Sequence, residues 1–318
     1  MRTAIVFSLL LLAGCQRDAR RVVGVIPKGA NHLFWQSVHA GAIKAAQEEG
    51  LKVEWNAPAT ETDTSRQIEI VESMVNRRLA GIAVAPVDRT ALVSSVERAA
   101  QAGVPVAIFD SEVDTPRRLT YVSTNNEEAG RIAARRLGEI MGGRGKAAIV
   151  GFKPGSASTM ERESGFQDEL KKKFPGVEIV ALQFGLADRA KSMTVTENIL
   201  TAHPDLDGLY GDNESSTAGA VQALKSRNAR NIKFVGMDAS DQIVQDMKDG
   251  WIDSLVLQDP FKMGYESVKA IAVKLAGRTP PAVIDTGVTL LLRNQLDEPR
   301  SKELLYPDVR RWLQLEGR

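Results

Sequence analysis

Short apolar runs alternate with helix-spaced apolar positions along most of this chain. Val22–Ile26 is a β-branched apolar run of the kind that forms a buried strand. Pro27, Gly29 and Asn31 follow directly and predict a loop. Beyond this loop the apolar residues recur at helical spacing until Gly50, so we expect a strand, a loop and a helix in that order.

The same alternation continues to about residue 276. Further strands are predicted at Leu51–Trp55, Gly81–Ala85, Pro105–Phe109, Tyr121–Ser123, Lys146–Gly151, Val177–Phe184, Leu206–Tyr210, Ile232–Gly236 and Ser254–Leu257. Helices are predicted at Thr64–Leu79, Ala91–Ala102, Glu127–Met141, Met160–Phe174, Ala190–His203, Ser215–Ser226, Ser240–Asp249 and Phe261–Ala276. This order is typical of an α/β protein with doubly wound parallel sheets. The pattern restarts near Glu127 without a flexible linker, which favours two such lobes joined by a hinge, with a cleft between them.

The first fifteen residues have a different character. Ala4–Leu12 is apolar and follows a short positive start, but it is far too short to span the ~30 Å core of a bilayer. Together with Leu12-Ala13-Gly14-Cys15, residues 1–15 resemble the signal peptide and lipobox of a bacterial lipoprotein. The resemblance implies cleavage before Cys15 and acylation of its thiol; the alternative is an ordinary buried cysteine. Because Cys15 is the only cysteine, disulfides and cysteine-based zinc sites are excluded.

Length and composition narrow the class of protein. A chain of 318 residues suggests about two domains. The net charge of +1 provides no large basic field, so we expect no nucleic-acid partner. The sequence contains no G-x-S-x-G, H-E-x-x-H or P-loop lysine motif, and we expect neither an enzyme nor a cofactor or metal site. His32 is the one candidate general base, and a binding role for it is favoured.

Polar and aromatic side chains recur where the predicted strands end. In an open parallel sheet this edge is where ligands bind. The candidate ligand-binding residues are Lys28, His32, Phe34, Trp35, Asp110, Ser111, Arg162, Asn213, Asp238 and Gln258. Most have an ordinary structural alternative: helix caps or turns for the Asp, Asn and Gln residues, the helix core for the two aromatics and solvent exposure for the arginine.

These residue types fit a polyhydroxylated ligand. A carboxylate such as Asp110 or Asp238 accepts hydrogen bonds from adjacent hydroxyls, and Arg162 presents a rigid fork of donors. The rings of Phe34 and Trp35 can pack on the C–H face of a sugar. The sequence therefore favours a site for a small sugar or polyol in the cleft.

An ordered set of motifs carries a resemblance to a known family. The motifs are Lys28 to Trp35, Phe109-Asp110, Glu161-Arg162-Glu163-Ser164-Gly165-Phe166, Asp188-Arg189, Leu200-Thr201-Ala202-His203-Pro204-Asp205, Gly211-Asp212-Asn213-Glu214, Val235-Gly236-Met237-Asp238 and Gln258-Asp259-Pro260. Over residues 21–288 the chain resembles the periplasmic sugar-binding proteins of ABC transporters, of the ribose- and allose-binding type, whose ligand domain is shared with LacI-type repressors.

The resemblance implies an extracytoplasmic binding protein, expected as a monomer, that delivers a sugar to a membrane permease. It also implies that the candidate residues, Lys28 and Arg162 among them, contact the sugar. His32, Ser111 and Ala187 depart from the ribose pattern and remove ring surface and one cation, which leaves the sugar open. A repressor would require a basic helix-turn-helix before the first strand. A sensory component that presents a furanosyl signal or an attractant remains the alternative to transport.

The family pattern also implies that the chain crosses between lobes three times. We place the crossings near Thr124, Asp253 and Thr286. The expected lobes are residues 21–124 plus 254–286, and residues 125–253 plus 287–318, with the part after Leu292 a surface extension.

Overall fold

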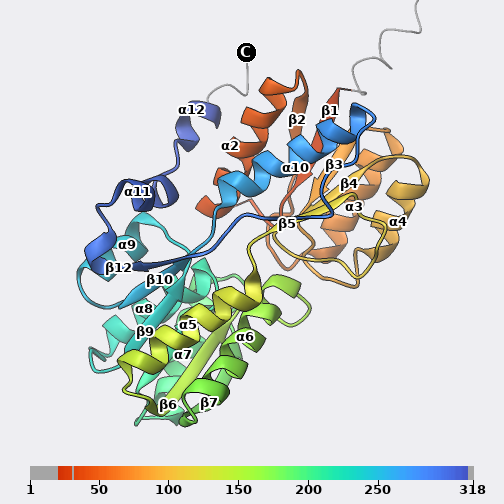
Figure 1. Ribbon diagram of the computed structural model, residues 1–318. Helices are drawn as coiled ribbons and strands as arrows, with labels where there is room; N and C mark the ends of the chain where they lie inside the picture. Colours follow the sequence, from red (N-terminus) through yellow and green to blue (C-terminus); the bar gives the residue numbers. More distant parts are fainter. Residues whose placement is uncertain (1–20, 31, 314–318) are drawn as a thin grey trace, which may run out of the picture.

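The computed structural model describes residues 21–30 and 32–313 and shows two α/β lobes stacked end to end (Figure 1). Within these residues each lobe is built on a six-stranded sheet that is mainly parallel. The predicted fold class is therefore confirmed: an α/β protein with two doubly wound, mainly parallel-sheet lobes.

The first sheet is parallel throughout the described strands. Its order is β11-β5-β4-β3-β1-β2. The strands are β1 (Val22–Ile26), β2 (Lys52–Trp55), β3 (Gly81–Val84), β4 (Val106–Phe109), β5 (Thr120–Ser123) and β11 (Val283–Asp285). β3 and β4 are fully buried apolar runs, as expected for central parallel strands covered by helices on both faces.

The second sheet repeats this arrangement with one reversed edge strand. Its order is β12-β10-β9-β8-β6-β7, and β12 pairs antiparallel with β10. The strands are β6 (Arg144–Gly151), β7 (Gly176–Phe184), β8 (Gly208–Gly211), β9 (Lys233–Met237), β10 (Ser254–Leu257) and β12 (Thr289–Leu292).

Helices cover both faces of each sheet. The helices of the first lobe are α2 (Leu33–Glu48), α3 (Thr64–Asn76), α4 (Val93–Gln101) and α10 (Pro260–Leu275). Those of the second are α5 (Asn126–Ile140), α6 (Ala157–Lys173), α7 (Arg189–Ala202), α8 (Glu214–Ser226) and α9 (Asp241–Lys248). Side chains that accept a backbone N–H of the first turn cap several of them, including Asp63, Asn125, Asp188, Ser240 and Asp259.

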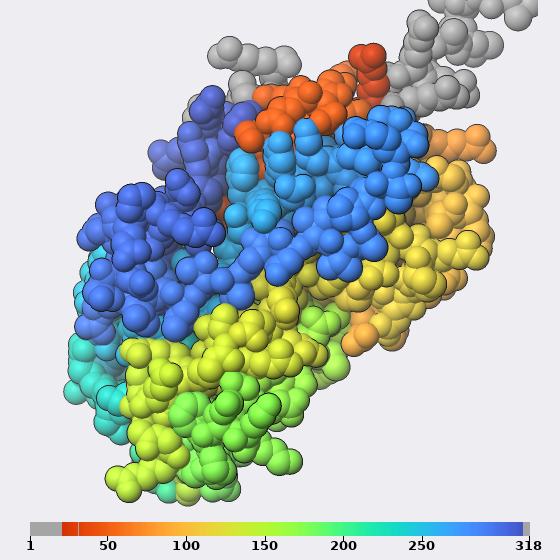
Figure 2. Space-filling view, in the orientation of Figure 1, coloured from red at the N-terminus to blue at the C-terminus, as the bar shows by residue number. Residues whose placement is uncertain are grey.

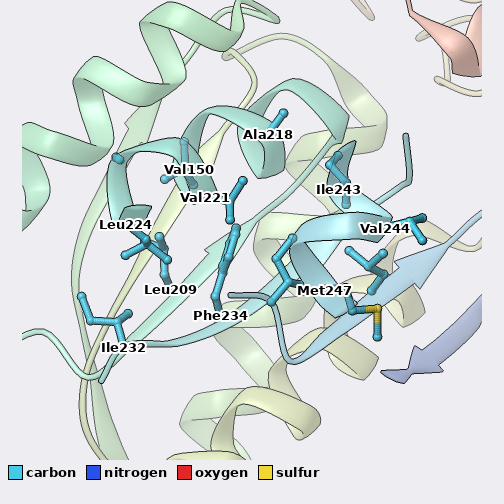
Figure 3. Packing of buried hydrophobic residues seen from close by; sticks show 14 of the residues in the cluster. Val150, Leu209, Ala218, Val221, Leu224, Ile232, Phe234, Ile243, Val244 and Met247 are labelled. Atoms are coloured by element: carbon cyan, nitrogen blue, oxygen red, sulfur yellow. The ribbon is translucent and has the colours of Figure 1, made fainter. Parts of the chain in front are cut away.

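The sheets and helices enclose apolar cores on each side of each sheet. Figure 3 shows part of one of them in the second lobe, where Phe234 of β9 lies among side chains of α8 and α9 such as Val221 and Met247. All three side chains are fully buried or nearly so. Such burial fixes the strands, and the loops at their carboxyl ends are held in place as a result.

Strand β10 corrects one predicted lobe boundary. We expected residues 254–286 to belong to the first lobe, but Ser254–Leu257 pairs parallel with β9 in the second sheet. The chain crosses after Leu257, and α10 then packs on α2 of the first lobe. An apolar run identifies a strand, but the sheet it joins depends on long-range pairing that periodicity does not report.

The C-terminal segment also differs from the prediction. After the short 3-10 turn η1 (Arg293–Gln295), helix α11 (Pro299–Leu305) buries Leu305 in the core of the second lobe. Helix α12 (Val309–Leu313) packs instead on α2 of the first lobe. Residues 287–313 therefore contact both lobes rather than the second alone, and Figure 2 shows this dark blue segment lying along one side of the molecule.

Two of the inter-lobe segments lie side by side. The Thr124 hydroxyl lies 3.5 Å from the Thr286 hydroxyl and donates to the Gly287 carbonyl at 3.1 Å.

Among the described residues no helix combines the length and the apolar character needed to cross a membrane.

Candidate functional site

A cavity lies between the two lobes at the carboxyl ends of their strands. The space between its walls, part of it open to solvent, amounts to about 370 Å³. Its walls are formed by Lys28, His32, Phe34, Trp35, Glu61, Asp110, Phe152, Ser158, Thr159, Arg162, Asn213, Glu214, Asp238 and Gln258. Both lobes contribute, so a ligand held there contacts both.

The second lobe presents a buried polar network to this cavity. The Arg162 guanidinium, 2% exposed, donates from Nε to Asn126 Oδ1 at 2.9 Å, from Nη1 to the Asp212 carbonyl at 2.9 Å and from Nη2 to Gln258 Oε1 at 2.8 Å. Gln258 in turn donates to Asp238 Oδ1 at 2.8 Å. Since each terminal nitrogen of an arginine carries two hydrogens, Nη1 and Nη2 each retain one N–H for a ligand.

Burial controls the charge of Asp238 in this network. Removal from water raises the pKa of Asp238 to about 6, although the Arg162 guanidinium and the Gln258 hydrogen bond act in the opposite direction. The carboxyl therefore ionises just below neutral pH and can then accept hydrogen bonds from two hydroxyls.

Aromatic rings form the apolar part of the wall. Phe34 and Trp35 meet edge to face, with ring centroids 4.8 Å apart, and Trp35 also packs on Phe109 of β4. From the second lobe, Phe152 directly follows β6 and reaches the same cavity. We expected the second lobe to have lost ring surface at Ala187, and Phe152 provides an aromatic group there.

A row of alternating charges crosses the cleft beside these rings. His32 Nδ1 lies 3.0 Å from Glu214 Oε2 in the second lobe, and His32 Nε2 lies 3.7 Å from Glu61 Oε1 in the first. Glu214 also pairs with Arg189. Burial lowers the pKa of His32, but the hydrogen bond to Glu214 and the charges of both glutamates outweigh it, so this pKa is raised above its ordinary value.

Lys28 and Ser111 make a second contact between the lobes. The Lys28 ammonium lies 2.7 Å from Asp110 Oδ2 and donates to Ser156 Oγ at 3.2 Å and to Ser158 Oγ at 3.1 Å. Ser111 lies behind the cavity wall, and its hydroxyl donates to Ser158 Oγ at 3.2 Å. Ser156 precedes α6 and Ser158 lies in its first turn, so both serines belong to the second lobe and the structure has its lobes closed.

Two carboxyl groups lie beneath the cavity in the second lobe. Glu163 and Asp212 are buried and hydrogen bond to each other, and the Phe152 backbone N–H donates to Asp212 Oδ2 at 3.1 Å. Burial and the charge of Asp212 raise the pKa of Glu163 to about 9, so at neutral pH the pair retains a proton. This pair supports the loop that carries Phe152.

The structure brings nearly all predicted site residues to one place. Every one except Ser111 lines the cavity, and Asn213 also caps α8, which was its structural alternative. Arg162 is buried rather than solvated. Cys15 lies outside the described residues.

Some lining residues were missed by the sequence prediction: Glu61, Phe152, Ser158, Thr159 and Glu214. Phe152 and Glu214 stand next to strand ends, a signal that could have found them. Glu61 lies in the loop before α3, and no local pattern distinguishes it.

In the described part of the chain no cluster of side chains is suited to hold a metal ion.

Two α/β lobes that close over a polar and aromatic cavity define a bilobal binding protein for a small solute. The model of the periplasmic binding protein domain matches residues 23–279. The chain belongs to this family. It is the solute-binding protein of a carbohydrate ABC transporter rather than an enzyme.

Similar proteins agree with this assignment. The ribose import binding protein of Bacillus subtilis is 28% identical, over 84% of this chain and 86% of its own length. The D-ribose/D-allose-binding protein of Pseudomonas aeruginosa is 30% identical, over 85% and 88%. The crystal structure of a carbohydrate transporter solute-binding protein from Agrobacterium radiobacter, in complex with D-arabinose, is 31% identical with a TM-score of 0.87, and the match covers 89% of this chain and 98% of that one.

Proposed function

We propose that this protein captures a neutral pentose, hexose or small polyol in the cavity between its lobes and delivers it to the permease of its transporter. The observation that carries this proposal is the composition of the wall: Arg162, Asp238 and Gln258 form a buried network with free hydrogen-bonding capacity beside aromatic rings. Such a combination suits a ligand with a ring of hydroxyls and an apolar face.

The polar residues have distinct roles in this proposal. Asp110 and Asp238 accept from hydroxyls on opposite sides of the sugar, whereas Arg162 and Asn213 donate to its oxygens. Phe34, Trp35 and Phe152 cover the faces of the ring. His32 pairs with Glu214, and Gln258 donates to Asp238. Both also line the cavity and complete the set of binding residues.

The similar proteins support a monosaccharide. The ligands named for the similar proteins are ribose, allose and D-arabinose, all neutral sugars.

The location of the protein is part of the proposal. Cys15 at the end of a lipobox-like segment supports a lipoprotein that is tethered outside the cytoplasmic membrane by its acylated N-terminus. We expect the tethered protein to act as a monomer, because one chain contains both lobes of the cleft.

A thermal-shift screen over neutral pentoses, hexoses and polyols tests the function. A sugar present at 100 times its dissociation constant should stabilise the folded protein by ~2.7 kcal/mol. Sugar acids serve as the matched control, since the buried carboxylates of the wall would repel them. Stabilisation by sugar acids, with no shift from any neutral sugar, would overturn the proposal.

A further inference from the structure

The N-terminus of α6 is completed by a residue of the other lobe. Ser156 is the residue before this helix, yet among the described residues its hydroxyl makes no capping bond to the helix. Instead the backbone N–H of Ser158, in the first turn of α6, donates to Ser111 Oγ at 3.0 Å across the cleft. The first N–H groups of a helix have no partner within the helix, so Ser111 supplies the acceptor that the helix lacks.

The hydroxyl that does not cap α6 is used in a second inter-lobe bond. Ser156 Oγ accepts from the Lys28 ammonium, which also bonds Ser158 Oγ and Asp110. An ammonium has three hydrogens, and these three partners use all of them in the closed structure. Lys28 therefore donates to two serines of the opposite lobe and to Asp110. Ser111 likewise bonds the opposite lobe, through Ser158.

All of these groups are withdrawn from water. Ser111 and Ser156 are 0% exposed, and Lys28 is 3% exposed. When the lobes separate, the N–H of Ser158 loses its partner in the other lobe and the Lys28 ammonium loses both of its serines. The bonds between Ser111, Lys28 and α6 thus exist only in the closed arrangement.

We propose that Ser111 is a positioning residue that caps α6 from the opposite lobe and thereby stabilises the closed state, with Lys28 as its partner. This inference rests on the proposed function, in which closure of the lobes traps the sugar. A ligand binds more tightly when the closed state is more stable, whatever its own contacts are. The contribution of Ser111 is therefore the same for every sugar, whereas a residue that touches the sugar changes the preference among sugars.

The test compares Ser111→Ala with the wild-type protein by calorimetry, on all sugars that the wild-type protein binds in a panel of neutral pentoses, hexoses and polyols. Loss of a helix cap weakens binding by about 2- to 30-fold. We expect a factor in this range that is equal for all sugars, with faster dissociation and an unchanged association rate. Ser267→Ala is the matched control: Ser267 is equally buried, in the first lobe, but bonds only within α10, so its loss should leave affinity unchanged.

A second variant checks the partner in the bond. Ser158→Ala removes a hydroxyl but keeps the backbone N–H that Ser111 accepts, and its effect should be smaller than that of Ser111→Ala. Equal affinity of Ser111→Ala and the wild-type protein for every sugar overturns this proposal alone, and so does a changed order of preference among sugars. A wild-type protein that binds no sugar in the panel overturns the proposed function and this proposal with it.

Discussion

Asp110 and Asp238 occupy equivalent places in the two lobes and share a left-handed backbone conformation. Asp110 follows β4 and Asp238 follows β9, each the third strand from the edge formed by β11 or β12. Their φ angles are 60° and 64°, and each backbone N–H donates at 3.0 Å to the neighbouring strand, at Val122 and Val256. Asp and Asn adopt this conformation more readily than most residues. Asn is therefore the substitution that changes the charge and preserves the backbone.

Sugar affinity should rise with pH through the pKa of Asp238. Burial raises this pKa from 3.8 to about 6, so the stability that the protonated carboxyl contributes is present below pH 3.8 and is lost as pH rises through 6. The hydroxyls of a sugar bond best to the ionised form. We expect binding at pH 5 to be weaker than at pH 8 by about fivefold or more, measured by calorimetry. Asp238→Asn should flatten the profile, and a wild-type profile that is already flat would contradict the assignment.

Replacing Arg162 by Lys should weaken binding strongly while the charge is kept. Lysine cannot bond Asn126, the Asp212 carbonyl and Gln258 at once in the planar arrangement that arginine provides. We expect a loss of about 1–3 kcal/mol, or roughly 5- to 150-fold in affinity, measured by calorimetry with a sugar that the wild type binds. Arg189→Ala is the control, since that side chain is 57% exposed, and its effect should be the smaller of the two.

The buried pair of Glu163 and Asp212 should make stability fall as pH rises. The pKa of Glu163 is raised from 4.5 in the unfolded chain to about 9 in the folded protein. Between these pH values the folded protein keeps a proton that the unfolded chain releases. The contribution of Glu163 to the free energy of unfolding is therefore complete below pH 4.5 and is lost as the pH rises through 9. Urea unfolding should show a negative slope of up to about 1.4 kcal/mol per pH unit in this window. Glu163→Gln should reduce the slope, and Glu139→Gln, at an exposed position, should not. Equal slopes in all three proteins would exclude the shared proton.

The proposed lipid anchor can be tested by the location of a Cys15 variant. Cys15→Ser removes the atom to which an acyl chain attaches, and we expect the variant to leave the membrane fraction and become soluble outside the cytoplasm. Fractionation with detection of the protein in each fraction measures this. Membrane association that is equal in the wild type and the variant would argue against the lipoprotein proposal.

Local sequence was sufficient to predict most of the elements and most of the residues that line the cavity. The run Val22–Ile26 forms β1, and the polar residues after the strands lie around one cavity, because parallel strands bring their carboxyl ends to the same edge of a sheet. The sequence also supplied the residue types around the cavity, where carboxylates, amides and an arginine suit the proposed recognition of hydroxyls.

Tertiary structure alone decided which lobe each segment joins and what each polar group bonds. The apolar run Ser254–Leu257 suits a buried strand in either sheet, and pairing with β9 places it in the second one. Glu61 and Ser111 lie in loops whose position depends on packing far away in sequence, so no periodicity could show that one lines the cavity and the other caps α6. Periodicity indicates which face of an element is buried, whereas contacts across a cleft depend on how the two lobes meet.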